Sequence, residues 1–125
     1  MNKTNSVLNK ALDKFHMKEA IAGFSGQIST SFSIMDDWRS KHKYLDIQKI
    51  IVLGMGGSAI GADVVRVIAQ PTCKIPIIVN RSYNIPTWVD ARTLVLASSY
   101  SGETEETLSA FAQCREKNAQ IIVLS

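Results

Sequence analysis

Short apolar runs that alternate with helix-like segments fill the chain from Gln48 onward and restrict its fold more than any other feature. Four of these runs have the length of a strand and are rich in β-branched residues: 49–53, 75–79, 93–97 and 120–124. Strands that are apolar on both faces are typical of parallel sheets covered by helices. Because parallel strands are joined by right-handed crossovers, the pattern predicts an α/β fold with a doubly wound, flavodoxin-like parallel sheet.

The segments between the runs also carry structural signals. The helix after the first run has an apolar face, and its natural cap is Ser58. That face consists of Ile60, Val64, Val67 and Ile68. Residues 80–90 are predicted to form an ordered loop without a helix. No helix follows the fourth run, so we expect a sheet truncated after its fourth strand, belonging to the amino-terminal portion of a longer protein.

The first 44 residues have a different pattern and are predicted to be a helical segment that packs on the sheet. Two sets of apolar residues repeat with helical spacing. They are Leu8, Ala11, Leu12 and Phe15, followed by Phe24, Ile28, Phe32, Met35 and Trp38. The predicted organisation is therefore a helical segment at 1–44 and a partial α/β domain at 45–125.

Composition excludes several classes of protein. The chain has 125 residues, of which 46% are hydrophobic, but no apolar stretch approaches the roughly 18 residues needed to cross a membrane. The net charge of +3 comes from bases interleaved with acids, so nucleic acid is not an expected partner. Cys73 and Cys114 are far apart without clustered histidines, which predicts two reduced packing cysteines and no metal site. Since the start also lacks a signal peptide, we expect a cytoplasmic protein.

Two Gly/Ser-rich loops, at 54–58 and 99–104, each follow an apolar run and open a helix. A helix amino end presents unpaired N–H groups and partial positive charge, and glycine lets the backbone approach an anion closely. Serine and threonine hydroxyls add neutral donors. The loops therefore predict a phosphate site at the carboxyl edge of the sheet. The simpler alternative is that Ser58, Ser101 and Thr104 are helix caps.

Nucleotide folds are alternatives for the first loop. Gly56 and Gly61 have the spacing of an NTP-binding P-loop, but Ala62 follows where that motif requires lysine. The fragment G-x-G-x-x-A at 54–59 fits a dinucleotide fold, which also needs an acid at the end of the second strand. Asn80 occupies that end. The NAD hypothesis is weakened for this reason, and we expect no cofactor.

Three motifs in order resemble the SIS (sugar isomerase) domain, and more narrowly the bifunctional phosphoglucose/phosphomannose isomerases. Gly-Met-Gly-Gly-Ser-Ala-Ile-Gly stands at 54–61, and Ser-Tyr-Ser-Gly-Glu-Thr-Glu-Glu-Thr at 99–107. Between them, an Arg-x-Tyr-x-x-Pro segment is formed by Arg81, Tyr83 and Pro86. The resemblance runs from about residue 45 to the last residue and implies an SIS-type sheet.

The resemblance also implies a ligand and the residues that bind it. The hydroxyls of Ser99, Ser101 and Thr104 would hold the phosphate of a sugar 6-phosphate, aided by the backbone of Gly102 and Glu103. The sugar side would be lined by Gly56, Gly57 and Ser58. The substrates would be glucose, mannose or fructose 6-phosphate, and the full-length form is expected to be a homodimer. The acidic side chains at 103, 105 and 106 must then point away from the phosphate, which they would repel.

Catalysis is not expected from this chain alone. Aldose–ketose isomerisation needs a positioned base and an acid for ring opening. The resemblance implies that these come from a later Glu, His and Lys, so no catalytic residue is assigned here. His16 and His42 match no catalytic motif. The alternatives are a non-catalytic SIS module, which binds sugar phosphate or forms dimers, and a dinucleotide-binding fragment of an oxidoreductase.

Overall fold

The computed structural model describes residues 13–36 and 38–125, which fall into two compact units divided between Lys41 and His42. The first unit contains helix α2 (Met17–Ala22) and helix α3 (Phe24–Asp36). The Asp13 carboxylate accepts hydrogen bonds from the N–H groups of Met17 and Lys18 at 2.7 and 2.9 Å and so caps α2. These bonds lower the pKa of Asp13.

Helix α3 confirms the helical spacing predicted from Phe24 to Met35, but it ends at Asp36, so Trp38, the last residue of the predicted repeat, lies outside it. Its apolar side chains are exposed, with Phe24 at 61% and Phe32 at 69%. The predicted repeat at Leu8, Ala11 and Leu12 lies outside the described residues. Among the described helices, none is both long enough and apolar enough to span a membrane.

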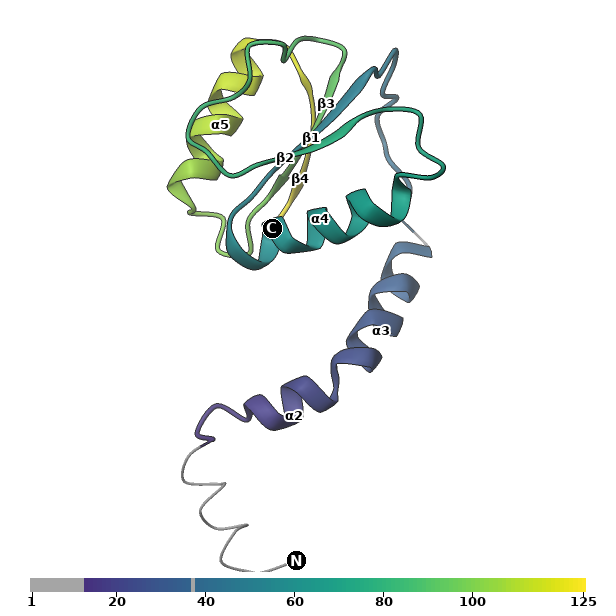
Figure 1. The fold of residues 1–125 in the computed structure, drawn as a ribbon, viewed down its shortest axis with the longest axis vertical. Coiled ribbons are helices and arrows are strands. Elements are labelled where there is room, and N and C mark those ends of the chain that lie inside the picture. Colours follow the sequence, from purple (N-terminus) through teal and green to yellow (C-terminus); the bar gives the residue numbers. More distant parts are fainter. Residues whose placement is uncertain (1–12, 37) are drawn as a thin grey trace, which may run out of the picture. The chain divides into compact units, whose positions relative to one another are not determined.

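The second unit is an α/β layer structure whose strands are all parallel (Figure 1). The strands lie in the order β2-β1-β3-β4, which confirms the predicted doubly wound sheet. Its elements are β1 (Lys49–Leu53), α4 (Gly56–Ala69), β2 (Ile77–Asn80), β3 (Thr93–Ser98), α5 (Glu105–Glu116) and β4 (Gln120–Leu124).

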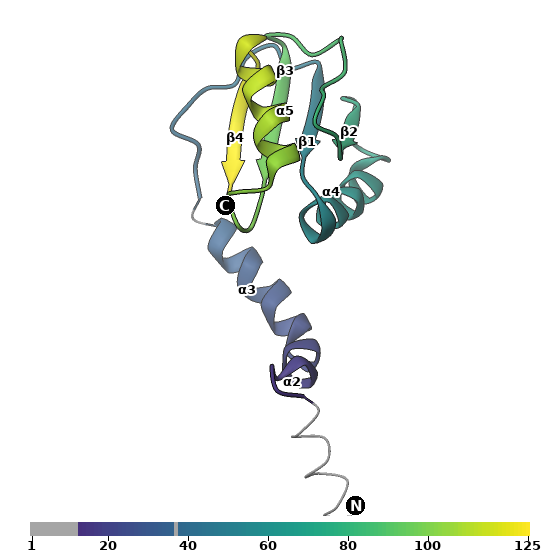
Figure 2. The same ribbon diagram turned by 90° about the vertical axis from the view of Figure 1, so that its left-hand side faces the viewer.

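Strand register brings the carboxyl ends together at one edge. Leu53, the last residue of β1, pairs with Asn80 of β2 on one side and with Ala97 of β3 on the other. The loops that follow β1 and β3 therefore leave the sheet side by side. The two helices that they open cover opposite faces of the sheet (Figures 1 and 2).

The main core lies between the sheet and α5. Alternate strand residues point to this face because side chains alternate along a strand. Its buried residues are Ile51, Leu53, Val89, Val95, Ala97, Ala110 and Cys114. The β2–β3 loop has no helix, as predicted, and packs Ile85 and Trp88 against this core.

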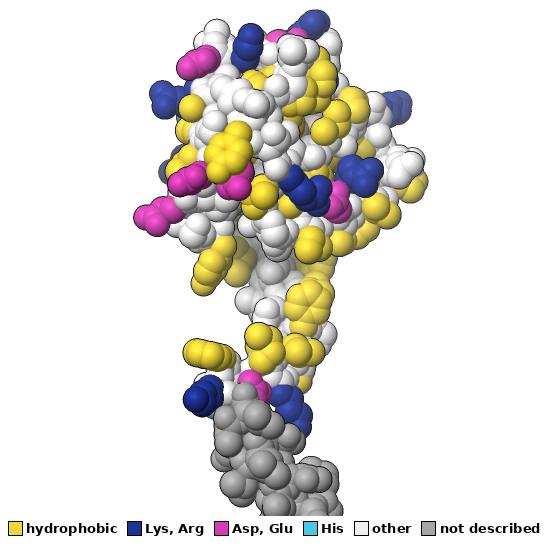
Figure 3. Space-filling view, turned by 60° about the vertical axis from the view of Figure 1, so that its left-hand side comes forward, with side chains coloured by type: hydrophobic (Ala, Val, Ile, Leu, Met, Phe, Trp, Pro, Cys, Tyr) yellow, Lys and Arg dark blue, Asp and Glu magenta, His cyan; other side chains and the backbone are white. Residues whose placement is uncertain are grey.

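Helix α4 covers the other face through small residues. Ala59 and Ala62 are its buried positions, whereas the predicted apolar face is exposed, with Ile60 at 62% and Ile68 at 72%. Figure 3 shows how much apolar surface remains open on the visible face of the molecule.

Candidate functional site

The β1–α4 turn lies in close contact with the end of β3. Gly54 is buried, and a Cβ there would lie 3.1 Å from the Ser98 carbonyl oxygen and 3.3 Å from the Ser58 Cβ. Only a residue without a side chain fits this space unless its neighbours move. The first Gly/Ser loop is therefore held against the strand that leads into the second.

The first loop enters its helix earlier than predicted. Gly56 has φ +51°, a conformation that favours glycine, and it is already the first residue of α4. Met55 occupies the cap position in extended conformation, and no side chain caps the helix. The cap predicted at Ser58 is therefore wrong, because Ser58 is the third residue of the helix. Gly56 and Gly57 are exposed, and Ser58 is half-buried.

The second loop gathers three hydroxyl groups, which we call the hydroxyl cluster: Ser99, Ser101 and Thr104. Ser99 Oγ lies 2.9 Å from Thr104 Oγ1 and 3.5 Å from Ser101 Oγ. Thr104 stands at the cap position of α5, yet it makes no cap hydrogen bond because its hydroxyl pairs with Ser99. A capping role therefore does not explain Thr104.

Backbone amides complete the geometry of this loop. The N–H of Gly102 donates to Ser99 Oγ at 3.2 Å, and the N–H of Glu103 donates to Ser101 Oγ at 3.2 Å. Gly102 has φ +71°, which turns the chain towards α5. The cluster thus lies at the amino end of a 12-residue helix, where unpaired N–H groups and the helix dipole stabilise negative charge.

Acidic side chains at the start of α5 have defined neighbours. The Tyr83 hydroxyl donates to Glu105 Oε2 at 3.2 Å. The negative charge of Glu106, together with partial desolvation and the bond to Glu105, raises the pKa of Tyr83. The carboxylates at 105 and 106 are therefore both close to the β2–β3 loop, and Glu103 is exposed.

Arg81, in the same loop, forms an ion pair with Asp63 of α4. Asp63 also lies 3.7 Å from Arg66. The Arg-x-Tyr segment thus contacts both helices, Arg81 at α4 and Tyr83 at α5. The motif contains Arg81 and Tyr83, but no sequence pattern links them to their partners Asp63 and Glu105, which are distant along the chain.

Some predicted site residues come together and others do not. The hydroxyl cluster, Gly102 and Glu103 form one hydrogen-bonded unit. The first loop is its neighbour through Gly54, but within the described residues no hydrogen bond joins Ser58 to the cluster.

A hollow of about 180 Å³ is lined by Ser99, Gly102 and Thr107 together with apolar residues of α5 and β4. Among the described residues, Thr107 Oγ1 is the one buried side-chain oxygen or nitrogen without a partner.

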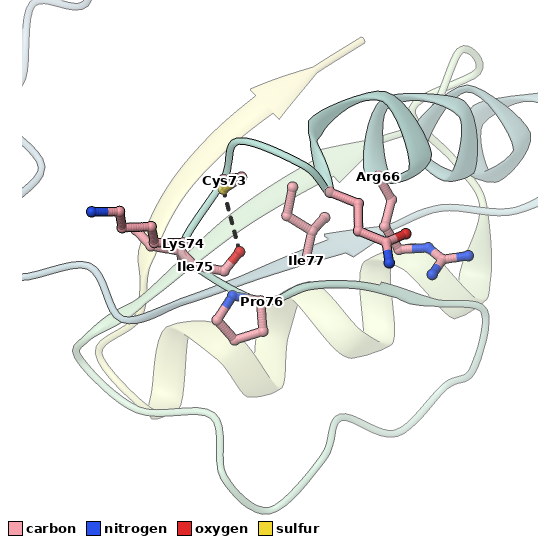
Figure 4. Close-up of a pocket in the computed structure, with 7 residues that line it drawn as sticks. Arg66, Cys73, Lys74, Ile75, Pro76 and Ile77 are labelled. Carbon is pink, nitrogen blue, oxygen red and sulfur yellow. Dashed lines mark hydrogen bonds between the residues drawn. The ribbon is translucent and has the colours of Figure 1, made fainter.

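A second hollow, of about 360 Å³, lies near the start of β2, at the opposite edge of the sheet. Figure 4 shows that the charged ends of its Arg66 and Lys74 point to opposite ends of the hollow, so they do not converge on one ligand. Neither hollow is lined by both Gly/Ser loops.

Both cysteines are free, as predicted. Cys114 is fully buried, and burial raises the pKa of its thiol to about 11, so it is an unreactive packing residue. Among the described residues, no three His, Cys, Asp or Glu side chains are grouped closely enough to hold a metal ion.

Comparison with known proteins decides the family. The SIS domain model matches residues 43–125, which contain the entire sheet and both loops. The chain belongs to the SIS domain family. Over 109 residues it is 46% identical to a bifunctional phosphoglucose/phosphomannose isomerase from Caldicellulosiruptor bescii, covering 87% of this chain and 32% of that protein. A protein of the same description from Thermoplasma volcanium is 40% identical over 73 residues, covering 58% of this chain and 23% of that protein.

Solved structures agree with this SIS fold. A protein assigned as a phosphosugar isomerase from Bacillus subtilis superposes with a TM-score of 0.54 and 26% identity, covering 73% of this chain and 28% of that one. The chain spans about a third, or less, of the length of the curated relatives described above.

Proposed function

We propose that this SIS domain binds a sugar 6-phosphate as the amino-terminal part of an isomerase that interconverts glucose or mannose 6-phosphate with fructose 6-phosphate. The observation that carries the proposal is the hydroxyl cluster at the amino end of α5. Three neutral hydroxyls and adjacent amides match the oxygens of a phosphate without burying a cation. The names of the relatives support the choice of a sugar phosphate.

Each site residue has a proposed role. Ser99, Ser101 and Thr104 hold the phosphate through their hydroxyls, and the N–H groups of Gly102 and Glu103 assist by donating to Ser99 Oγ and Ser101 Oγ and so orienting these hydroxyls. The sugar lies towards the neighbouring β1–α4 turn, against Gly56, Gly57 and Ser58. The support for this second half is the contact that Gly54 makes with the end of β3.

Turnover requires groups beyond this set. Moving a proton between C1 and C2 of the sugar needs a base, and opening the ring needs an acid. The carboxylate beside the cluster, Glu105, is hydrogen-bonded to Tyr83. We therefore assign no catalytic residue and expect no isomerase activity from the 125-residue chain in a dehydrogenase-coupled assay.

The second candidate is a non-catalytic SIS module that binds sugar phosphate and forms dimers. The exposed apolar face of α4 favours it, because large exposed apolar areas are typical of interaction surfaces. A homodimer of the full-length protein would cover such a face. The two reduced cysteines agree with a cytoplasmic location.

Calorimetric titration tests the proposal. We expect fructose 6-phosphate to bind and NADPH not to bind, and the reverse result would favour a dinucleotide-binding domain. Ser101→Ala should weaken fructose 6-phosphate binding by about 1.5–3 kcal/mol, the scale of a hydrogen bond to a charged group. Ser33→Ala in α3 is a matched control that leaves the affinity unchanged. Equal affinity of Ser101→Ala and wild type would contradict the assignment.

A further inference from the structure

Tyr83 contacts α5 through two independent sets of hydrogen bonds, one at the first residue of the helix and one further along it. Its hydroxyl donates to Glu105, the first residue of the helix. Its carbonyl oxygen accepts from Ser109 Oγ at 3.1 Å and from Gln113 Nε2 at 2.7 Å. Gln113 Oε1 also accepts from the N–H of Ile85 at 3.4 Å. The loop backbone is thus fastened to α5 without any contribution from the phenol oxygen.

Glu105 is one of two acidic residues next to the hydroxyl cluster, the other being the exposed Glu103. Glu105 directly follows Thr104, a member of the hydroxyl cluster, and consecutive Cα atoms are about 3.8 Å apart. A glutamate side chain at this position can reach within several ångströms of a phosphate held by the cluster. At that distance a carboxylate repels a dianion appreciably, even in a watery environment.

Tyr83 provides the alternative partner for this carboxylate. Tyr83 is 46% exposed, and the hydrogen bonds that its carbonyl oxygen accepts hold it against α5. Glu106 is also close to it, as the raised pKa of Tyr83 indicates. Both acidic residues in the first turn of α5, Glu105 and Glu106, therefore lie close to Tyr83.

We propose that Tyr83 is a positioning residue that holds the Glu105 carboxylate against the β2–β3 loop and away from the bound phosphate. The inference rests on the proposed function and deepens it, because it assigns a role in anion affinity to the tyrosine of the Arg-x-Tyr segment. Without the phenol oxygen, Glu105 is free to turn towards the phosphate. The site then binds dianionic sugar phosphates more weakly.

The test is a double-mutant cycle measured by calorimetric titration with fructose 6-phosphate. Tyr83→Phe should weaken binding about 3- to 10-fold at low salt. This is the effect on affinity expected when one carboxylate repels a dianion across several ångströms of water. At about 0.5 M salt, where screening acts within a few ångströms, the loss should fall below about twofold. In a Glu105→Gln background, Tyr83→Phe should have no effect. A merely structural role would give the same loss in both backgrounds and at both salt concentrations.

Two further variants make the result decisive. Glu105→Gln alone should bind within about twofold of wild type, and a large gain in affinity would mean that the carboxylate already faces the phosphate. Tyr44→Phe is the matched control. Its neighbour Leu45 bonds to Gln120, the first residue of β4, so Tyr44 lies at the opposite edge of the sheet.

The outcomes separate the two proposals. If wild type binds fructose 6-phosphate and Tyr83→Phe binds equally well, the positioning role is wrong and the proposed function stands. If wild type fails to bind, the proposed function fails and the positioning role fails with it. Thermal melts of Tyr83→Phe and Glu105→Gln should match wild type, because neither change removes the hydrogen bonds of the Tyr83 carbonyl oxygen.

Discussion

Gly54 joins the two Gly/Ser loops, and replacing it with alanine tests that junction. The new Cβ would lie 3.1 Å from the Ser98 carbonyl oxygen and 3.3 Å from the Ser58 Cβ. Non-bonded carbon atoms prefer separations of about 3.5–4.0 Å, so Ser58 and its turn must move by a few tenths of an ångström. Overpacking of this kind costs about 1–3 kcal/mol. Alanine also reduces the conformational freedom of the unfolded chain, which stabilises the fold by about 0.4–1 kcal/mol. The free energy of unfolding should therefore fall by roughly 0.5–2 kcal/mol.

Gly61→Ala is the matched control for this experiment. Gly61 lies inside α4, and beyond its chain neighbours and the nearby backbone of the helix itself, a Cβ there would have no atom within 4 Å. Alanine should stabilise that helix by about 0.5–1 kcal/mol. Urea unfolding followed by circular dichroism should therefore move the midpoint down for Gly54→Ala and up for Gly61→Ala. If both midpoints rise, the two loops are not in contact and the reasoning is refuted.

Three further predictions concern Thr107 and the two cysteines. Thr107→Val removes the unpartnered buried hydroxyl and should raise the free energy of unfolding by about 1 kcal/mol in urea; a fall would show that the hydroxyl has a partner. The thiol of Cys114 has its pKa raised from 9.0 to about 11, so the folded state holds this proton more tightly than the unfolded state. Stability should consequently fall as the pH rises from about 9 towards 11, and Cys114→Ala should flatten this dependence, measured as the urea midpoint at each pH. At pH 8 the half-exposed Cys73 should be alkylated before Cys114, and the opposite order would contradict the assigned burial.

The strands could be predicted from local pattern because each is a short apolar run with clear ends. The predicted bounds of the first and fourth runs coincide with β1 and β4. The second run was predicted to begin at Ile75, yet β2 begins at Ile77. Pro76 explains the difference, since it has no N–H to donate and contributes only its carbonyl, which accepts from the N–H of Ile50 at 2.9 Å.

Helix starts and side-chain partners were harder to predict. A serine after two glycines is a reasonable cap, but the positive φ of Gly56 begins α4 before Ser58 is reached. The hydroxyl pairing of Ser99 with Thr104 requires the turn at Gly102, which residue types alone do not specify. The contacts of Arg81 with Asp63 and of Tyr83 with Glu105 depend on the packing of both helices on the sheet. Such long-range contacts have no local signature.

Binding of one sugar phosphate by both Gly/Ser loops can be followed in a nuclear magnetic resonance titration. Fructose 6-phosphate is added to isotope-labelled protein while the amide signals of residues 56–58 and 99–104 are followed. We expect both sets of signals to shift along curves with a single dissociation constant, and inorganic phosphate to shift mainly the second set. Shifts confined to one loop, or two different dissociation constants for the sugar phosphate, would contradict binding by both loops.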